Sequence, residues 1–391
     1  MHYIRQCLEP GRILNYRDSI LEKSVTLAGN ADMAKQAGMV ELQLTDQCNL
    51  NCFHCHFRNQ GDVFFRREWL DLVTDEILPQ AVSLAGGGEP TLYPDFDGTV
   101  RKLKNGKSAP QIGLITNGVF IPPGSWPSQL SWLRVSLYSV VGGRYAGMPF
   151  LMQEKVMDNI VRYMDMDELP MLGVSLLYYK GNVADCVKLS YELYKRIKGV
   201  KREIGRFNIQ YKRAFVLCDP RRMNEKNHQE NLQLLPDRAE LAAAASYKEE
   251  LCMADAGFQE FLDICSNYSQ IEDFIHGGME EAAAQTEPSR ITPQNFPHCY
   301  AVLESRLITP DGYVYPCPSI AENRDTGLAL GHITDKNEVF QKRVLHYYSC
   351  GSKWCNRRFC RHFRHNELFQ SLLDTGEMPE YGSSIRKDKF F

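Results

Sequence analysis

The sequence predicts an α/β protein: a partial (β/α)6 barrel, then a helical connector, then a small C-terminal domain that contains a β-hairpin. Three observations lead to this prediction. Short apolar runs alternate with amphipathic segments from residue 38 onward, a stretch rich in Lys, Glu and Ala follows, and an Asp-Gly pair separates two β-prone runs near the C-terminus. These features predict four segments, at 1–37, 38–218, 219–295 and 296–391.

Six apolar runs in the second segment are predicted to be strands, at 39–45, 81–88, 111–118, 133–139, 172–179 and 206–214. Most are separated by segments with apolar residues at helical spacing, at 67–78, 96–105, 154–165 and 183–197. Such alternation is typical of βαβ units and of a parallel sheet that is buried on both faces. Six units are fewer than the eight that close a full barrel, so we expect an open one.

The connector and the C-terminal segment differ from the barrel in composition. The run "ELAAAASYKEELC" at 240–252 predicts a helix in the connector. The run "SRLITPDGYVYPCP" at 305–318 predicts a hairpin that turns at Asp311-Gly312. This dipeptide favours a type I′ turn, which requires positive φ at both central residues.

The composition excludes several classes of protein. A net charge of -3 favours neither a nucleic-acid partner nor a membrane-surface partner. The sequence has no apolar run of about 18 residues and no secretion signal at its start. We therefore expect a cytoplasmic protein.

The 13 cysteines require an explanation other than disulfides, because the cytosol is reducing. Eight of them form two groups: Cys48, Cys52 and Cys55, and then Cys299, Cys317, Cys350, Cys355 and Cys360.

The first group lies in "DQCNLNCFHC", directly after the first predicted strand. Structural zinc sites take four ligands, usually as two pairs, and three cysteines in one loop do not fit that pattern. Three thiolates can hold a [4Fe–4S] cluster and leave its fourth iron open for another ligand. An incomplete zinc site and three buried thiols are the alternatives.

The spacing C-x3-C-x2-C after a first strand resembles the radical S-adenosylmethionine superfamily. The resemblance covers about residues 38–215 and implies that the open iron binds S-adenosylmethionine. Reductive cleavage would then give methionine and a 5′-deoxyadenosyl radical.

Further motifs occur in the order that this resemblance implies. "GGGEP" at 86–90 is similar to the family's Gly-Gly-Glu motif. Gly87 and Gly88 would let the backbone approach the methionine amine, and Glu89 would accept a hydrogen bond from it. A turn is the alternative interpretation of this run.

Three more residues resemble cosubstrate contacts. Asn117 would lie near the ligand, Ser136 would contact it, and His54 would pack on the adenine. Each of them is equally compatible with an ordinary strand-end or surface position.

The second cysteine group resembles the auxiliary-cluster extensions called SPASM and twitch domains. Twelve residues separate Cys299 from Gly312, and four more precede Cys317. A hairpin at Gly312 would bring Cys317 back towards Cys299. The full SPASM pattern has seven cysteines, so the five present here fit a single auxiliary [4Fe–4S] cluster better. Four of these five would be its ligands: Cys299, Cys317, Cys350, Cys355 and Cys360. A zinc ribbon-like site is the alternative.

Arginines are interleaved with the last cysteines at 353–365. These cations would stabilise an anionic cluster or an anionic substrate group. A solvated surface is the alternative.

The resemblance implies hydrogen abstraction from an unactivated C–H bond of a substrate. A second cluster near the substrate favours oxidation, with two [4Fe–4S] clusters, S-adenosylmethionine and an electron donor such as flavodoxin or ferredoxin. The alternative is an epimerase in which Cys218, or a spare C-terminal cysteine, returns hydrogen. A cluster-bearing scaffold or electron-transfer protein also remains open.

Related enzymes act on sugars and aminocyclitols in natural-product biosynthesis, or modify peptides and proteins. Peptide modifiers often carry an N-terminal leader-binding domain larger than the 47 residues that precede Cys48. We therefore expect a small polar substrate, such as a sugar, an aminocyclitol or an amino-acid-like compound. The alternative is a peptide- or protein-modifying enzyme whose peptide is presented without such a domain.

Overall fold

The computed structural model describes most of the barrel and part of the C-terminal segment. The described residues are 23, 26–27, 29–52, 54–55, 57, 61–138, 150–169, 171–200, 207–214, 233–265, 298–322, 324–350, 366, 370 and 374. Among the predicted site residues, Cys218, Cys355 and Cys360 lie outside this set, and so does the side chain of Cys350.

One nine-stranded sheet runs through the molecule in the order β6-β5-β4-β3-β2-β1-β7-β8-β9. The first six strands are parallel neighbours in sequence order. Their bounds are β1 Met39–Leu42, β2 Ala81–Leu84, β3 Gln111–Thr116, β4 Trp132–Leu137, β5 Leu172–Tyr178 and β6 Phe207–Arg213. The predicted open barrel of six β/α units is confirmed, because β6 and β1 do not pair.

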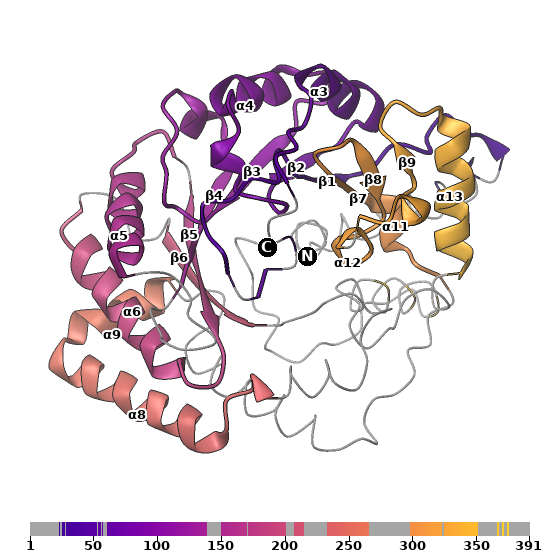
Figure 1. Ribbon diagram of the computed structural model, residues 1–391. Coiled ribbons are helices and arrows are strands. Elements are labelled where there is room, and N and C mark those ends of the chain that lie inside the picture. Colours follow the sequence, from indigo (N-terminus) through magenta and orange to yellow (C-terminus); the bar gives the residue numbers. More distant parts are fainter. Residues whose placement is uncertain are drawn as a thin grey trace.

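Helices cover the outer side of the curved sheet (Figure 1). They are α3 Leu70–Leu72, α4 Phe96–Asn105, α5 Phe150–Met164 and α6 Val183–Ile197, with the 3-10 turns η3 Pro90–Leu92 and η4 Trp126–Gln129. The predicted helix at 67–78 is irregular: α3 is flanked by η1 Arg67–Trp69 and by the π-helical turn η2 Val73–Ile77. It ends at Leu78, which has a left-handed backbone with φ of 55°.

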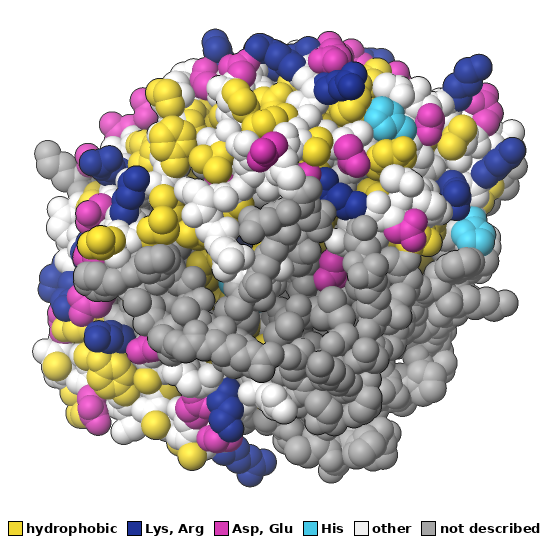
Figure 2. Space-filling view, viewed as in Figure 1, with side chains coloured by type: hydrophobic (Ala, Val, Ile, Leu, Met, Phe, Trp, Pro, Cys, Tyr) yellow, Lys and Arg dark blue, Asp and Glu magenta, His cyan; other side chains and the backbone are white. Residues whose placement is uncertain are grey.

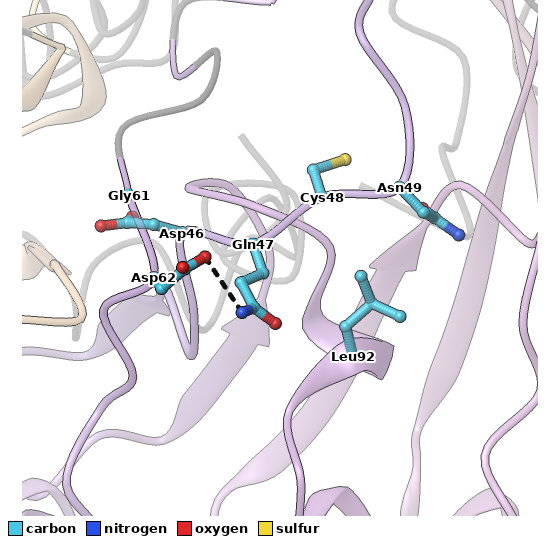
Figure 3. Close-up of a pocket in the computed structure, with 7 residues that line it drawn as sticks. All are labelled: Asp46, Gln47, Cys48, Asn49, Gly61, Asp62 and Leu92. Atoms are coloured by element: carbon cyan, nitrogen blue, oxygen red, sulfur yellow. Dashed lines mark hydrogen bonds between the residues drawn. The ribbon is translucent and has the colours of Figure 1, made fainter.

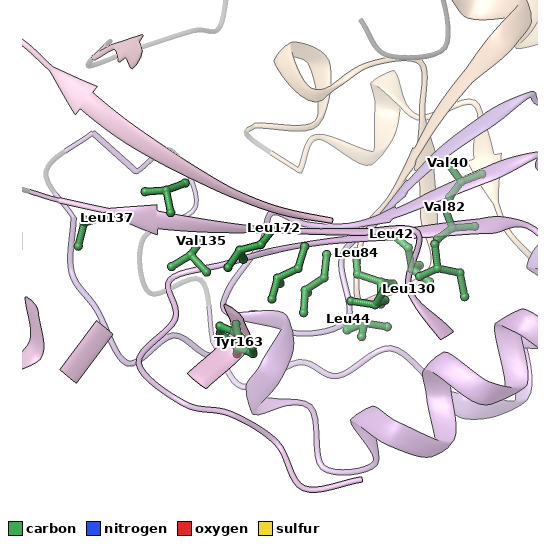
Figure 4. Close-up of a cluster of buried hydrophobic side chains, with 14 of the residues drawn as sticks. Val40, Leu42, Leu44, Val82, Leu84, Leu130, Val135, Leu137, Tyr163 and Leu172 are labelled. Atoms are coloured by element: carbon green, nitrogen blue, oxygen red, sulfur yellow. The ribbon is translucent and has the colours of Figure 1, made fainter. Parts of the chain in front are cut away.

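The main hydrophobic core fills the space between the sheet and these helices. Alternate strand residues such as Val40, Leu42, Leu84 and Val135 lie in it, and each is at most 1% exposed. Figure 4 shows these side chains along one face of the strands. Since side chains alternate along a strand, the residues between them point to the opposite, inner face of the barrel.

The predicted C-terminal hairpin is confirmed, and it belongs to the barrel sheet. β7 Ser305–Ile308 pairs in parallel with β1 and antiparallel with β8 Tyr313–Tyr315, and β9 Gly331–His332 follows β8. The helices of this region are α11 Ala301–Glu304, α12 Pro318–Ala321 and α13 Asn337–Cys350, with the turn η7 Thr326–Leu328.

The predicted type I′ turn is wrong. Gly312 has a positive φ of 85°, but Asp311 does not. The Gly312 amide donates to the Thr309 carbonyl (2.9 Å), and the Thr309 amide donates to the Tyr313 carbonyl (3.0 Å). The loop is therefore a three-residue connection that ends in one left-handed glycine. Pro310 explains the difference, because its ring fixes φ near -65° and starts an ordinary turn one residue earlier.

The helix predicted at 240–252 is confirmed as α8 Arg238–Ala254, and α9 Ala256–Cys265 follows it. The Asp237 side chain caps α8 by accepting from the Glu240 amide (3.0 Å). None of the described helices is long and apolar enough to cross a membrane. Figure 2 shows Lys and Arg side chains interspersed with Asp and Glu around the rim of one face.

Candidate active site

The cysteine loop begins where β1 leaves the sheet. After Leu42 the chain stays extended, and Thr45 forms an antiparallel bridge with Phe64. The Asp46 amide donates to the Val63 carbonyl (3.0 Å), and the Phe65 amide donates to the Leu44 carbonyl (2.8 Å). These bonds join the two ends of the loop, so its cysteines are carried at the carboxyl end of the sheet.

Cys48, Cys52 and Cys55 differ in exposure: exposed, buried and intermediate, respectively. The Cys55 amide donates to the Cys52 carbonyl (3.1 Å), which closes a turn between them. Cys48 is exposed as a residue, but its thiol is partly shielded from water, and this partial desolvation raises its pKa; the nearby Glu89 and Cys55 add to the rise. A cluster ligand must be a thiolate, so binding a metal there would release a proton.

The glycine-rich run after β2 packs directly against the cysteine loop. The Gly88 amide donates to the Thr45 carbonyl (2.6 Å), and the Glu89 amide donates to the Gln47 carbonyl (2.7 Å). A Cβ on Gly88 would lie 1.9 Å from the Gln47 carbonyl oxygen. Only glycine allows this approach, and Gly87 has a left-handed φ of 64°. The observed close approach is therefore to the protein's own backbone, and approach to a methionine amine stays a prediction.

Glu89 is buried, with 3% of its surface exposed. Its Oε1 accepts from the Thr116 hydroxyl (2.6 Å) and from the Thr91 hydroxyl (2.8 Å) and amide (3.2 Å). Its Oε2 accepts from the Asn117 amide (2.7 Å). Burial raises the pKa of Glu89, whereas these hydrogen bonds lower it, and burial is the larger effect. The carboxylate joins the ends of β2 and β3, and Oε2, which accepts one hydrogen bond, has a second lone pair that can accept another.

Asn117 connects the end of β3 to the cysteine loop. Its Nδ2 donates to Asn49 Oδ1 (2.6 Å), and its Oδ1 accepts from the Val119 amide (3.0 Å). Its side chain also hydrogen-bonds Cys48. Asn117 is therefore placed beside the first predicted cluster ligand.

His54 and Ser136 both contact Tyr138, a residue that was not predicted from the sequence. The His54 and Tyr138 rings contact edge to face, 5.0 Å apart. Tyr138 hydrogen-bonds Ser136, and burial raises its pKa, with Cys52 and Cys55 adding to the rise. The period of two along the predicted strand was the available signal, because it places residues 136 and 138 on one face.

The three predicted cluster ligands are not yet gathered around one point. Among the described residues, no three Cys, His, Asp or Glu side chains stand at metal-binding distance. The donor set nevertheless fits an iron–sulfur cluster, since three thiols share one loop and a buried network of Glu89 and Asn117 lies beside it. The loop would have to close around the cluster.

A pocket of about 350 Å³ opens beside Cys48 (Figure 3). At this pocket, the side-chain nitrogen of Gln47, Nε2, donates to Asp62 Oδ1 (3.0 Å). The residues that line it are Asp46, Gln47, Cys48, Asn49, Gly61, Asp62 and Leu92. The pocket places open volume next to the most exposed of the three thiols.

The inner face of the barrel carries polar side chains that the sequence reasoning also missed. Arg134 of β4 is 4% exposed, and its Nη1 donates to Gln210 Oε1 of β6 (2.6 Å). Burial lowers its pKa to about 10. Gly173 of β5 lies beside this bridge, and a Cβ there would make an ordinary van der Waals contact with Arg134 Nε (3.4 Å).

Gln43 lies on the same inner face, just after β1. It is 0% exposed, and neither polar atom of its side-chain amide has a hydrogen-bond partner among the described residues. A Cβ on Gly86 would lie 2.8 Å from Gln43 Nε2 and 2.9 Å from Glu41 Oε1. The Gln43 amide and the Glu41 carboxylate therefore lie close together over Gly86, on the inner face of the barrel.

The second cysteine group is only partly described. The Cys299 amide donates to the Tyr348 carbonyl (3.2 Å), two residues before Cys350 at the end of α13. Asn366 Nδ2 contacts Cys299 Sγ (3.9 Å).

Cys317 precedes α12, and the carbonyl of the residue before it, Pro316, lies 3.4 Å from the Ser305 hydroxyl. The same hydroxyl donates to the Ala301 carbonyl (3.0 Å). Cys299 thus lies near α13, and Cys317 lies near the end of α11.

The geometry defines a class of protein: an open α/β barrel with a three-cysteine loop and a buried carboxylate at the carboxyl ends of its strands. Ligands bind at this edge in β/α barrels.

No family model matches the chain. It is 31% identical over 118 residues to a GTP 3′,8-cyclase of Lactiplantibacillus plantarum, covering 27% of this chain and 35% of that protein. It is 32% identical over 94 residues to a GTP 3′,8-cyclase of Streptomyces coelicolor, covering 20% of this chain and 26% of that protein. The chain thus spans about a third or less of the length of these relatives.

Solved structures with a similar fold include Streptococcus suis SuiB bound to the precursor peptide SuiA, at 14% identity and a TM-score of 0.47, covering 94% of this chain and 80% of that one. BtrN in complex with AdoMet and 2-DOIA gives 13% identity and a TM-score of 0.38, covering 82% and 92%. In its motifs, and over the part of its length that matches these relatives, the chain is similar to enzymes of the radical S-adenosylmethionine superfamily.

Proposed function

We propose that this protein is an enzyme that cleaves S-adenosylmethionine reductively and abstracts hydrogen from an unactivated C–H bond of a small polar substrate, leading to oxidation. One observation carries the proposal. The Cys48 loop, Glu89 and Asn117 come from the ends of three neighbouring strands and are hydrogen-bonded into one site.

The residues have separate roles in this proposal. Cys48, Cys52 and Cys55 would hold a [4Fe–4S] cluster that passes one electron from an external donor to S-adenosylmethionine, whose S–C5′ bond then breaks to give methionine and the 5′-deoxyadenosyl radical. Glu89 Oε2 accepts a hydrogen bond from the amine of the cosubstrate. Gly88 allows the glycine run to contact the cysteine loop, so that both approach the same ligand.

The segment 296–391 is proposed to hold an auxiliary [4Fe–4S] cluster of the SPASM or twitch kind. Two contacts support this: Cys299 is bonded to α13 just before Cys350, and the chain six residues beyond Cys360 returns to Cys299 through Asn366. Such a cluster is an electron acceptor for the substrate radical, which is why oxidation is preferred over epimerisation through Cys218.

The inner face of the barrel supports a polar substrate. Among the described residues, both polar atoms of the Gln43 amide lack a hydrogen-bond partner, and an apolar substrate would leave them so. A substrate with hydroxyl or amino groups would satisfy the Gln43 amide.

A second candidate is a radical cyclisation. The matched relatives are named as GTP 3′,8-cyclases, and they share the superfamily with this chain. The match covers about a quarter of the chain, so the reaction does not transfer with it.

The test is anaerobic reconstitution with iron and sulfide, then reduction in the presence of S-adenosylmethionine. We expect 5′-deoxyadenosine from the wild-type protein and none after Cys48, Cys52 and Cys55 are replaced by Ala. Cys252→Ala is the control, because Cys252 lies on α8 outside both cysteine groups. A reconstituted protein that binds S-adenosylmethionine without cleaving it would contradict the proposal and favour a scaffold.

A further inference from the structure

A buried ion pair joins the cysteine loop to the C-terminal hairpin region. Arg324 Nη1 donates to Asp46 Oδ2 (2.6 Å), and Arg324 Nη2 donates to Asp46 Oδ1. The side chains are 13% and 1% exposed, respectively. The two residues lie 278 positions apart in sequence, so only the fold brings them together. Two parallel hydrogen bonds between a guanidinium and a carboxylate fix orientation as well as distance.

The carboxylate end of this pair lies close to the first predicted cluster ligand. Asp46 comes two residues before Cys48, and its amide is bonded to the Val63 carbonyl. The next residue, Gln47, donates its amide to Thr45 Oγ1 (3.0 Å) and accepts from the Glu89 amide. A change in the position of the Asp46 side chain is therefore transmitted to Cys48 over a short and well-bonded backbone.

Arg324, at the other end of the ion pair, is connected to Cys317 through backbone hydrogen bonds. Helix α12 begins directly after Cys317, whose carbonyl accepts from the amides of Ile320 and Ala321 (3.2 Å each). The Arg324 amide donates to the Ala321 carbonyl (2.8 Å). Arg324 has a left-handed φ of 50°, which is unfavourable for a residue with a long side chain. The bidentate contact with Asp46 is one interaction that stabilises this conformation.

We propose that Arg324 is a positioning residue that, through Asp46, fixes the Cys48 loop relative to Cys317 and couples the two predicted cluster sites. The inference rests on the proposed function for what each site binds. The structural link itself does not depend on it. Formation of the site at Cys317 orders α12 and Arg324, and the ion pair then holds the Cys48 loop in place for S-adenosylmethionine.

The experiment compares wild type, Arg324→Gln and Arg324→Lys. Lys35→Gln is the matched control: Lys35 is 4% exposed, pairs with Glu76 and donates to the Ile333 carbonyl, and touches neither cysteine group. In the reconstituted proteins, we measure the dissociation constant for S-adenosylmethionine and the change that it causes in the electron paramagnetic resonance spectrum of the reduced cluster.

Arg324→Gln should weaken binding about tenfold or more and alter that spectral change, because a charge-assisted pair is lost. Arg324→Lys, which keeps the charge but loses the bidentate geometry, should recover part of both. Lys35→Gln should change neither. A dissociation constant within about twofold of wild type for Arg324→Gln, with an unchanged spectrum, would overturn the proposal. If Arg324→Gln does not fold, Arg324→Lys is the deciding variant. A dissociation constant and a spectrum equal to those of the wild type would then overturn the proposal.

The coupling is tested by adding Cys317→Ala to the wild type and to Arg324→Gln. If Arg324 transmits the state of the Cys317 site, Cys317→Ala should alter the S-adenosylmethionine-dependent spectrum in the wild type and add little in Arg324→Gln. Equal effects in both backgrounds would refute the coupling.

Amide hydrogen exchange of the metal-free protein separates the two levels of inference. Arg324→Gln should accelerate exchange about tenfold or more in residues 46–50 and leave α4 unchanged. Unchanged exchange in 46–50 would refute the positioning role. If exchange in residues 46–50 is faster in Arg324→Gln but the wild-type protein takes up no cluster on reconstitution, the proposed function and the coupling are refuted. The ion pair would then have a structural role alone.

Discussion

Replacing Glu89 by Gln tests the buried carboxylate that joins the ends of β2 and β3. The substitution keeps an oxygen at Oε1 for Thr116 and Thr91, but it places an amide NH2 where Oε2 now accepts from the Asn117 amide at 2.7 Å. The new NH2 group of the glutamine side chain and the backbone amide of Asn117 are both donors, so they cannot hydrogen-bond each other. The lost charge-assisted hydrogen bond is worth about 1.5–3 kcal/mol.

Removal of the charge offsets part of this loss. Burial raises the pKa of Glu89, so the ionised carboxylate is costly in the folded protein. We therefore expect the free energy of unfolding of Glu89→Gln to fall by about 1–2 kcal/mol, at the low end of the hydrogen-bond range. Affinity for S-adenosylmethionine should fall by about ten- to a hundredfold, because Oε2 also loses its ability to accept from the amine.

Urea unfolding of the metal-free protein and equilibrium binding to the reconstituted protein measure the two effects separately. Thr91→Val is the control, since it removes the 2.8 Å bond to Glu89 Oε1 and leaves Oε2 unchanged. It should lower stability by about 1 kcal/mol without changing the dissociation constant. A Glu89→Gln protein that keeps its clusters and binds S-adenosylmethionine within about twofold of wild type would remove Glu89 from the ligand site.

Three further predictions follow from the cysteine groups and the barrel interior. The anaerobically reconstituted protein should hold about eight irons, and replacing Cys48, Cys52 and Cys55 by Ala should leave about four; about four in the unmutated protein would exclude the auxiliary cluster and call for a zinc assay. Turnover in deuterated water should give a product two hydrogens lighter without solvent deuterium, whereas a product of unchanged mass in ordinary water that carries one deuterium in heavy water would indicate epimerisation, with Cys218 or a spare C-terminal cysteine as donor. Gln43→Leu should raise the free energy of unfolding of the substrate-free protein by about 1–3 kcal/mol, because it removes a buried amide that has no hydrogen-bond partner in the described part of the chain; a loss of stability would mean that the amide is satisfied in the folded protein.

The order of the strands was predictable because it depends on local patterning. Apolar runs alternating with amphipathic helices leave few arrangements other than parallel βαβ units in sequence order, and the pairing of β1 through β6 follows that order. The hairpin at Gly312 was predictable for the same reason. Its turn type was not, since Pro310 shifted the turn by one residue.

The contacts between distant segments were not predictable. Nothing in the sequence pairs Arg324 with Asp46, or places β7 beside β1. Tyr138 and Gln43 were recognisable only as strand positions, because a period of two gives the face of a side chain and not the neighbour that it meets.

The sequence alone therefore determined the ingredients of this protein: the barrel units, the three-cysteine loop and the Gly-Gly-Glu run, each encoded within a short stretch of chain. The tertiary structure decided how they meet. It buried the Glu89 carboxylate under hydrogen bonds from Thr91, Thr116 and Asn117, seated Gly88 on the cysteine loop, and joined that loop to the C-terminal hairpin region through one ion pair. The physical reason is range: propensity and periodicity act over a few residues, whereas burial and ion pairing depend on which surfaces the whole chain brings into contact.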